Sequence, residues 1–308
     1  MNIVYTPYEK IDKVKWDACI THSLNGLIYA ESFYLDTMAS NWDAIIFGDY
    51  EAVMPLTWRK KLGISYLYQP AFSQQGGIFS NRPISIEEVS AFVQMAMQKF
   101  SFAEISLNYL NTGLIELNNV TIRNRNNFIL PLGRGYEKIQ NEYSPYIKRK
   151  IKNVAASELT YSQPTNYSEA IDLYEKLYQH RIKGISTADY IQFKKLCSFY
   201  SENGRILIRQ VHSADNNELL AQILFLKDNN RLYNIIPCIT EKGKELLANY
   251  FLYNELIKEY AADNIIIDFE GSDIPGVAYF YEKFASKNQQ YPAIKFNTLP
   301  AIIKLFKK

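Results

Sequence analysis

The run Asp268-Phe269-Glu270-Gly271-Ser272-Asp273 holds the residue types best suited to chemistry. It overlaps the end of an apolar stretch, 264–269, that is typical of a short buried strand. Residues two apart in a strand face the same side, so Asp268 and Glu270 are expected together at its carboxyl end, where α/β sheets bind ligands. Two close carboxylates repel, which raises the pKa of one and suits it to take a proton from an amine. Ser272 is expected to contact the substrate. The structural alternative is that Asp268 caps a turn and Glu270 is solvated.

A polar loop, 240–244, precedes a helix expected over 245–261. Backbone N–H groups at the start of a helix bind phosphate, and glycine lets a ligand approach closely. Lys242, Gly243 and Lys244 are therefore candidates for holding the phosphates of a donor. A single glycine is also typical of a plain connecting loop.

Two further candidates are a tyrosine and a basic helix. Tyr281 lies in a short helix expected after Pro275, and its hydroxyl can protonate a leaving thiolate; the alternative is a packed aromatic ring with a solvated hydroxyl. In the helix expected over 146–154, Arg149 and Lys152 could hold the phosphates of a substrate, whereas such charges more often form a solvated face.

Composition narrows the class of protein. Among 308 residues, 34 Lys and Arg oppose 32 Asp and Glu, so no overall field attracts nucleic acid and no DNA partner is expected. Three distant cysteines and three histidines show no zinc or disulfide spacing, and no metal is expected. Without a signal peptide or an apolar run of about 20 residues, the sequence predicts a cytoplasmic protein with no transmembrane segment.

Both halves of the chain show the same order of expected elements: three strands, a loop containing glycine, a helix and a strand. The expected ranges are 42–47, 51–57, 66–70, 85–99 and 102–108 in the first half, and 205–211, 218–226, 231–237, 245–261 and 264–269 in the second. The first helix has Ser85 as N-cap and Glu88 three residues later, a capping box. The repeat predicts an α/β protein of two similar mixed-sheet domains, 1–135 and 136–308, the second including the basic helix as a linker.

This order, ending in FYEKFA at 280–285, resembles the GCN5-related N-acetyltransferase (GNAT) superfamily. Together with KRKIKNV at 148–154 and IDFEG at 267–271, it resembles the tandem Fem-type (FemAB-like) branch. The resemblance implies two GNAT-like acyl-CoA N-acyltransferase domains, of which the first is a non-catalytic copy and the second binds the donor and is catalytic.

The resemblance also implies roles for individual residues. Tyr281 matches the family's general acid, and the loop at Lys242-Gly243-Lys244 matches the segment that holds the pyrophosphate of acyl-CoA. A strand amide near Pro237-Cys238 would polarise the carbonyl, and Glu270, with Asp268, would orient or deprotonate the amine. The expected donor is acetyl-CoA or another acyl-CoA, and the expected acceptor is an amine on a small molecule or a peptidoglycan precursor.

Departures from the GNAT pattern keep two alternatives open. The loop has one glycine where the family has two, and Ala285 replaces the usual glycine after FYEKF. A Fem-type enzyme would instead use aminoacyl-tRNA and a cell-wall precursor, with Arg149 and Lys152 lining a basic groove. The other alternative is a non-catalytic binding or scaffold protein with a degenerate GNAT fold.

Overall fold

The computed structural model describes residues 2–113, 117–154, 159–180, 182, 184–271 and 273–299. The chain forms two compact units: one comprises the residues up to Arg125 together with those from Gln290 onward, and the other comprises Asn126–Gln289. The expected boundary between residues 135 and 136 therefore falls inside the second unit. The reason is that a strand before this boundary belongs to the second sheet, whereas the last described strand belongs to the first.

The first unit is built around a mixed sheet with the strand order β1-β2-β3-β4-β6-β15-β7, and β5 pairs with β3. All of these pairs are antiparallel except β4–β6. The elements are β1 (Ile3–Thr6), a 3-10 turn (Tyr8–Lys10), α1 (Lys13–His22), a second 3-10 turn (Ile28–Ala30), α2 (Ser32–Met38), β2 (Trp42–Phe47), β3 (Ala52–Lys61), β4 (Ile64–Tyr68), β5 (Phe79–Ser80), α3 (Ile86–Lys99), β6 (Phe102–Ser106), β7 (Val120–Arg125) and β15 (Tyr291–Asn297).

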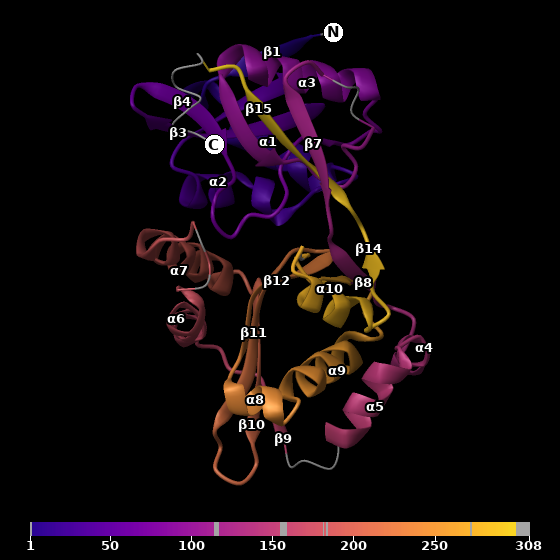
Figure 1. Cartoon of the computed structure of the whole chain (residues 1–308). Coiled ribbons are helices and arrows are strands. Elements are labelled where there is room, and N and C mark those ends of the chain that lie inside the picture. Colours follow the sequence, from indigo (N-terminus) through magenta and orange to yellow (C-terminus); the bar gives the residue numbers. More distant parts are fainter. Residues whose placement is uncertain are drawn as a thin grey trace. The chain divides into compact units, whose positions relative to one another are not determined.

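The second unit has the same kind of sheet, with the strand order β14-β8-β13-β12-β11-β10-β9 and β12–β13 as its parallel pair. Helices α6 and α9 cover opposite faces of this sheet (Figure 1). The elements are β8 (Phe128–Pro131), α4 (Tyr136–Asn141), α5 (Pro145–Val154), β9 (Leu159–Ser162), α6 (Tyr167–Tyr178), α7 (Thr187–Glu202), β10 (Ile206–Ser213), β11 (Leu219–Lys227), β12 (Arg231–Ile239), α8 (Glu241–Glu245), α9 (Ala248–Tyr260), β13 (Ile266–Asp268), α10 (Pro275–Glu282) and β14 (Lys287–Asn288).

These elements confirm the predicted α/β class and the tandem repeat of mixed sheets. The predicted capping box of α3 is present: the Ser85 hydroxyl accepts from the Glu88 amide, and the Glu88 carboxylate accepts from the Ser85 amide. Apolar side chains of α9, among them Leu252 and Leu256, pack with those of β11, among them Leu220, in the core of the second unit. None of the described helices combines the length and the apolar character that a membrane span requires.

Each sheet contains one strand that comes from the other half of the chain, and the two strands occupy equivalent positions in their sheets. In the first sheet β15 lies between β6 and β7, and in the second β8 lies between β13 and β14. Figure 1 shows the yellow β15 beside the magenta β7. Only Asn126 and Asn127 separate β7 from β8, yet these strands belong to different sheets. The two halves of the chain thus exchange one strand each.

Candidate functional site

The parallel strands of the second unit separate early. Strands β12 and β13 pair over three positions, the last of which sets Tyr233 opposite Asp268, while β12 continues to Ile239. Strand β12 also has a bulge at Ile235, because Asn234 faces Phe225 whereas Ile236 faces Leu224. The carboxyl ends of parallel strands are the usual ligand position in such sheets, and a bulge changes the direction of nearby side chains.

Asn234, the first residue after the last parallel pair, connects two tyrosines. Its Nδ2 atom donates to the Tyr253 hydroxyl at 2.8 Å and to the Tyr281 hydroxyl at 3.3 Å. The Tyr281 ring stacks on Phe269, with 4.7 Å between the ring centroids. An amide nitrogen only donates, so both hydroxyl oxygens act as acceptors here and the Tyr281 proton is not used in this bond.

The environment of Tyr281 keeps its hydroxyl protonated. The pKa of Tyr281 is raised to about 12, mainly by burial; the Glu270 carboxylate also raises this pKa, whereas hydrogen bonding with Tyr253 and Asn234 lowers it. A phenol with this pKa carries its proton throughout the physiological range. Tyr281 can therefore act as a proton donor, which is the role predicted for it from the sequence.

Glu270 lies two residues beyond the end of β13. Strand β13 ends at Asp268, and Glu270 has a left-handed backbone with φ of 63°. The expectation that Asp268 and Glu270 share one face of a strand is therefore wrong. The Oε1 atom of Glu270 is buried and has no hydrogen-bond partner among the described residues, and burial raises the pKa of this carboxyl well above its usual value. Strained backbone of this kind is typical of functional sites.

Asp268 supports the turn that carries Glu270. Its Oδ2 atom lies 2.5 Å from Arg231 Nη1, and 1% and 5% of the two side chains are exposed. The same Oδ2 accepts from Asn127 at 3.3 Å, and Oδ1 accepts from the Glu270 amide at 3.0 Å. Both carboxylate oxygens are therefore already bonded, as the structural alternative predicts.

The segment expected to cradle phosphate is a short helix. Residues 241–245 form α8, and the Gly243 N–H donates to the Oγ1 atom of its N-cap, Thr240, at 3.0 Å. A Cβ atom at Gly243 would lie 2.1 Å from the Leu220 carbonyl oxygen. The expectation of an open loop over 240–244 is therefore wrong: close packing of α8 on β11 accounts for the glycine.

The other residues predicted to bind the donor here also contact residues of the second unit itself. Lys242 pairs with Glu218 and Lys244 with Glu241, each at 2.6 Å. Pro237 lies opposite Ile223 in the β11–β12 pair and has no N–H to offer a carbonyl. The buried Cys238 Sγ accepts from Gln222 at 3.6 Å, and burial raises the pKa of the thiol to about 12.

The basic helix carries its charge on the surface. Arg149 and Lys152 are exposed on α5 and form no ion pair with a described residue. The Arg149 guanidinium lies 6.0 Å from the centre of the Tyr146 ring. Helix α5 packs on α9, where the hydroxyls of Tyr146 and Tyr250 are 3.2 Å apart. The predicted substrate contact Ser272 lies outside the described residues.

Sequence reasoning missed Asn234 and Tyr253. Asn234 has the only side-chain amide in the largely apolar stretch 231–237, and 1% of this residue is exposed. A buried amide inside such a strand needs hydrogen-bond partners, so its position was a usable signal. Tyr253 gave no such signal, because a tyrosine on the apolar face of a helix is typical of an ordinary core.

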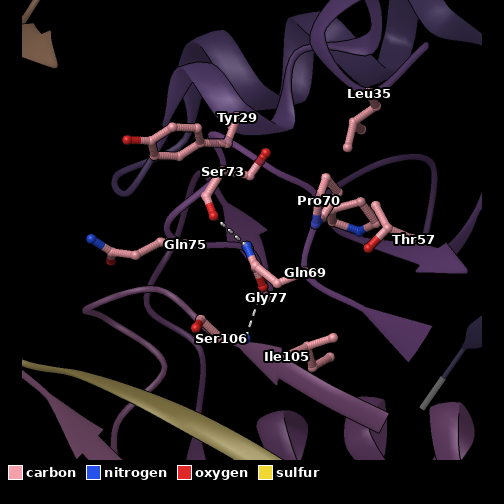
Figure 2. A pocket seen from close by; sticks show the side chains of 12 residues that line it. Tyr29, Leu35, Thr57, Gln69, Pro70, Ser73, Gln75, Gly77, Ile105 and Ser106 are labelled. Atoms are coloured by element: carbon pink, nitrogen blue, oxygen red, sulfur yellow. Dashed lines mark hydrogen bonds between the residues drawn. The ribbon is translucent and has the colours of Figure 1, made fainter. Parts of the chain in front are cut away.

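A pocket lies at the equivalent place in the first unit (Figure 2). Strands β4 and β6 pair in parallel up to Tyr68 opposite Glu104. Gln69 comes directly after Tyr68, as Asn234 comes directly after Tyr233 in the second unit. Ser106 is two residues after Glu104, as Glu270 is two residues after Asp268. The Ser106 amide donates to Gln69 Oε1 at 2.9 Å. The cavity measures about 360 Å³ with its open side, and among the described residues no carboxylate, Lys, Arg or His lines it.

Comparisons with known proteins identify the fold. No family model matches the chain, and no curated protein matches its sequence. Among solved structures, FemX is similar over 100% of both chains, with a TM-score of 0.66 and 13% identity. L-PGS from Bacillus licheniformis is similar over 96% of this chain and 95% of its own, with a TM-score of 0.56 and 11% identity.

A third similar structure is a tandem GNAT protein from the clavulanic acid biosynthesis pathway. It matches over 97% of this chain and 99% of its own, with a TM-score of 0.53 and 8% identity. The chain thus has the tandem GNAT-like fold, as these solved structures do. This confirms the resemblance stated from the sequence motifs at the level of the fold.

Proposed function

We propose that the protein is an N-acyltransferase and that the second unit carries the chemical step. The observation that supports this most is the place of Tyr281, bonded to Asn234 where β12 and β13 separate, with the Glu270 carboxylate near enough to raise the pKa of Tyr281. Tyr281 is a buried phenol that keeps its proton, and Glu270 has a buried Oε1 atom without a hydrogen-bond partner among the described residues. The fold is also one that FemX and a tandem GNAT protein share.

The reaction divides two proton transfers between these residues. Glu270, once ionised, takes a proton from the attacking amine as its nitrogen forms a bond to the carbonyl carbon of the donor. The bond from that carbon to the leaving sulfur or oxygen then breaks, and Tyr281 gives its proton to the leaving atom. The proton held by Glu270 returns to Tyr281 through solvent, so the site is restored. A positioned acid or base contributes about 10²–10⁴-fold to such a step.

The first unit is proposed as a non-catalytic copy. Its pocket has Ser106 at the place that corresponds to Glu270, and the amide of Ser106 is bonded to Gln69. None of the described residues that line this pocket is a carboxylate or a histidine, the side chains best suited to take a proton from an ammonium near neutral pH.

Acyl-CoA is the simplest donor, and an aminoacyl ester of tRNA is a second candidate. The second is favoured by the closed helix α8, in which the Gly243 amide and both lysines already have partners. It is also favoured by the exposed cations of α5, which have no anionic partner among the described residues. A cell-wall precursor would then be the acceptor class to test first.

Donor-dependent stability and transfer test these proposals together. The melting temperature of the protein should rise with the concentration of its donor, either acetyl-CoA or an aminoacyl-tRNA mixture, and labelled acyl groups should move to an amine acceptor. Stabilisation by neither donor, with no transfer, would favour the non-catalytic scaffold.

Two double variants test whether tRNA, and not acyl-CoA, is the donor. If tRNA is the donor, the double change Arg149→Ala and Lys152→Ala should weaken tRNA binding and reduce its salt dependence. Lys242→Ala with Lys244→Ala is the matched control, because these two lysines already have carboxylate partners.

A further inference from the structure

The turn between β3 and β4 carries a leucine at its tip. Lys61 pairs with Ile64 across the two strands, so Leu62 and Gly63 alone make the connection. Leu62 is 88% exposed, the highest value among the exposed large apolar residues of the part of the chain that the structure describes. A Cβ atom at Gly63 would meet nothing within 4 Å, so the tip stands in open space.

The backbone of this turn is one that leucine rarely adopts. Leu62 has φ of 51° and Gly63 has φ of 81°. A two-residue hairpin turn with both φ angles positive favours Asn-Gly or Asp-Gly, because asparagine and aspartate tolerate the left-handed region better than leucine does. Single exposed apolar residues are ordinary on protein surfaces, but one that also strains the backbone is typical of a functional position.

Two lysines precede this leucine. Lys60 and Lys61 end β3, both are exposed, and neither forms an ion pair with another described residue. Lysines beside an exposed apolar side chain suit an anionic lipid surface, where the cations meet the head groups and the apolar group enters the boundary with the acyl chains. Nucleic acid fits this tip less well, because leucine has no ring on which a base can stack.

We propose that the β3–β4 turn, residues 60–63, is a docking surface for an anionic lipid bilayer. Lys60 and Lys61 contact the lipid head groups, and Leu62 enters the boundary between head groups and acyl chains. Two cations and one leucine give a weak, reversible attachment that depends on anionic lipid and weakens as salt rises. The turn belongs to the first unit and shares no residue with the proposed catalytic site, so this surface can be tested independently of the proposed function.

Co-sedimentation of the full chain with lipid vesicles tests the proposal. One set of vesicles contains phosphatidylglycerol and phosphatidylcholine, and the other contains phosphatidylcholine alone. The protein should bind the anionic vesicles at low salt and bind about 10-fold more weakly to the neutral vesicles. No binding to the anionic vesicles, or equal binding to both sets, would overturn the proposal. Binding of single-stranded RNA without binding of vesicles would also overturn it and assign the lysines to nucleic acid.

Variants of the turn separate its apolar and charged parts. Leu62→Asn removes the apolar group and suits the left-handed backbone, so the fold is kept, and it should weaken vesicle binding about 10-fold. Lys60→Gln with Lys61→Gln should weaken binding at low salt about 10-fold or more. Unchanged binding in either variant would contradict the proposal.

Val14 on α1 is the matched control. It is 82% exposed, but its neighbours in sequence, Lys13 and Lys15, each already pair with an aspartate at 2.6 Å. Val14→Asn should leave vesicle binding unchanged. A loss equal to that of Leu62→Asn would show that the turn is not the docking surface.

A fluorescent label locates the contact directly. All three cysteines of the chain are buried, so Leu62→Cys supplies an accessible thiol for a polarity-sensitive dye. The emission of this dye should move to shorter wavelength when anionic vesicles are added, whereas a dye on Val14→Cys should show no shift. Equal shifts at the two positions, or no shift at position 62, would reject the docking surface.

Discussion

The guanidinium of Arg231, the first residue of β12, reaches the carboxylate of Asp268, the last residue of β13, with 2.5 Å between Nη1 and Oδ2. This buried pair connects the two parallel strands just before they separate. Because Asp268 also accepts the Glu270 amide, the ion pair fixes the turn on which the proposed base stands.

Asp268→Asn should therefore act mainly on stability. It leaves the buried Arg231 without its counter-charge, which costs about 3–5 kcal/mol of the free energy of unfolding. Urea denaturation measures this loss. Lys244→Ala, which breaks an exposed pair, is the control and should change stability by about 0–1 kcal/mol. A variant Asp268→Asn of normal stability that has lost turnover would instead show that Asp268 acts on the chemical step, by positioning Glu270.

Tyr281→Phe should lower turnover by about 10²–10⁴-fold while the fold is kept, because only the proton donor is removed. Steady-state acyl transfer measures the loss. Tyr279→Phe is a matched control on the same helix, since 49% of Tyr279 is exposed, and it should leave turnover unchanged. Equal turnover in the Tyr281→Phe variant would remove Tyr281 from the mechanism.

Glu270 should make the protein less stable as pH rises. Its pKa is raised by burial in the native state, whereas in the unfolded chain it returns to about 4.3. Below the unfolded value both states bind the proton. Between the unfolded and native values only the unfolded state releases it, which lowers the free energy of unfolding by up to about 1.4 kcal/mol per pH unit.

Glu270→Gln should remove this decline. Denaturation from pH 4 upward should show equal stability of the two proteins at the acid end and a growing advantage for the variant above it. The same variant should lose turnover most at high pH, where the wild-type carboxylate is ionised and able to accept a proton. Parallel stability curves at all pH values would show that burial does not shift this carboxyl.

Gly243→Ala should destabilise the second unit by about 1–3 kcal/mol, because the new Cβ would lie 2.1 Å from the Leu220 carbonyl oxygen and the backbone would have to move. Gly276→Ala is the matched control: Gly276 is in α10 and a Cβ there meets nothing within 4 Å, so helix propensity predicts equal or greater stability. Thermal unfolding compares the two. A Gly243→Ala variant as stable as the wild type would restore the case for a flexible donor loop.

Local patterns explain what the sequence could predict. The capping box at Ser85 and Glu88, and the apolar spacing of α9, involve residues a few positions apart, and the structure has them where expected. The strand exchange involves β8 and β15, which pair with strands far away in sequence, and no local pattern encodes such a choice of partner. For the same reason the left-handed turn at Glu270 was missed: the apolar stretch before it gives no sign that the strand stops at Asp268.

The exchange of β8 and β15 has a consequence for how this protein is made. A growing chain reaches the end of β7 with the neighbouring place in its first sheet still vacant, because β15 is synthesised only after the entire second unit. During synthesis the first sheet therefore stays incomplete, with no strand between β6 and β7, until β15 has been made. Cleaving the chain into halves near residue 135 would leave that gap permanent, so neither half is expected to be an autonomous folding module.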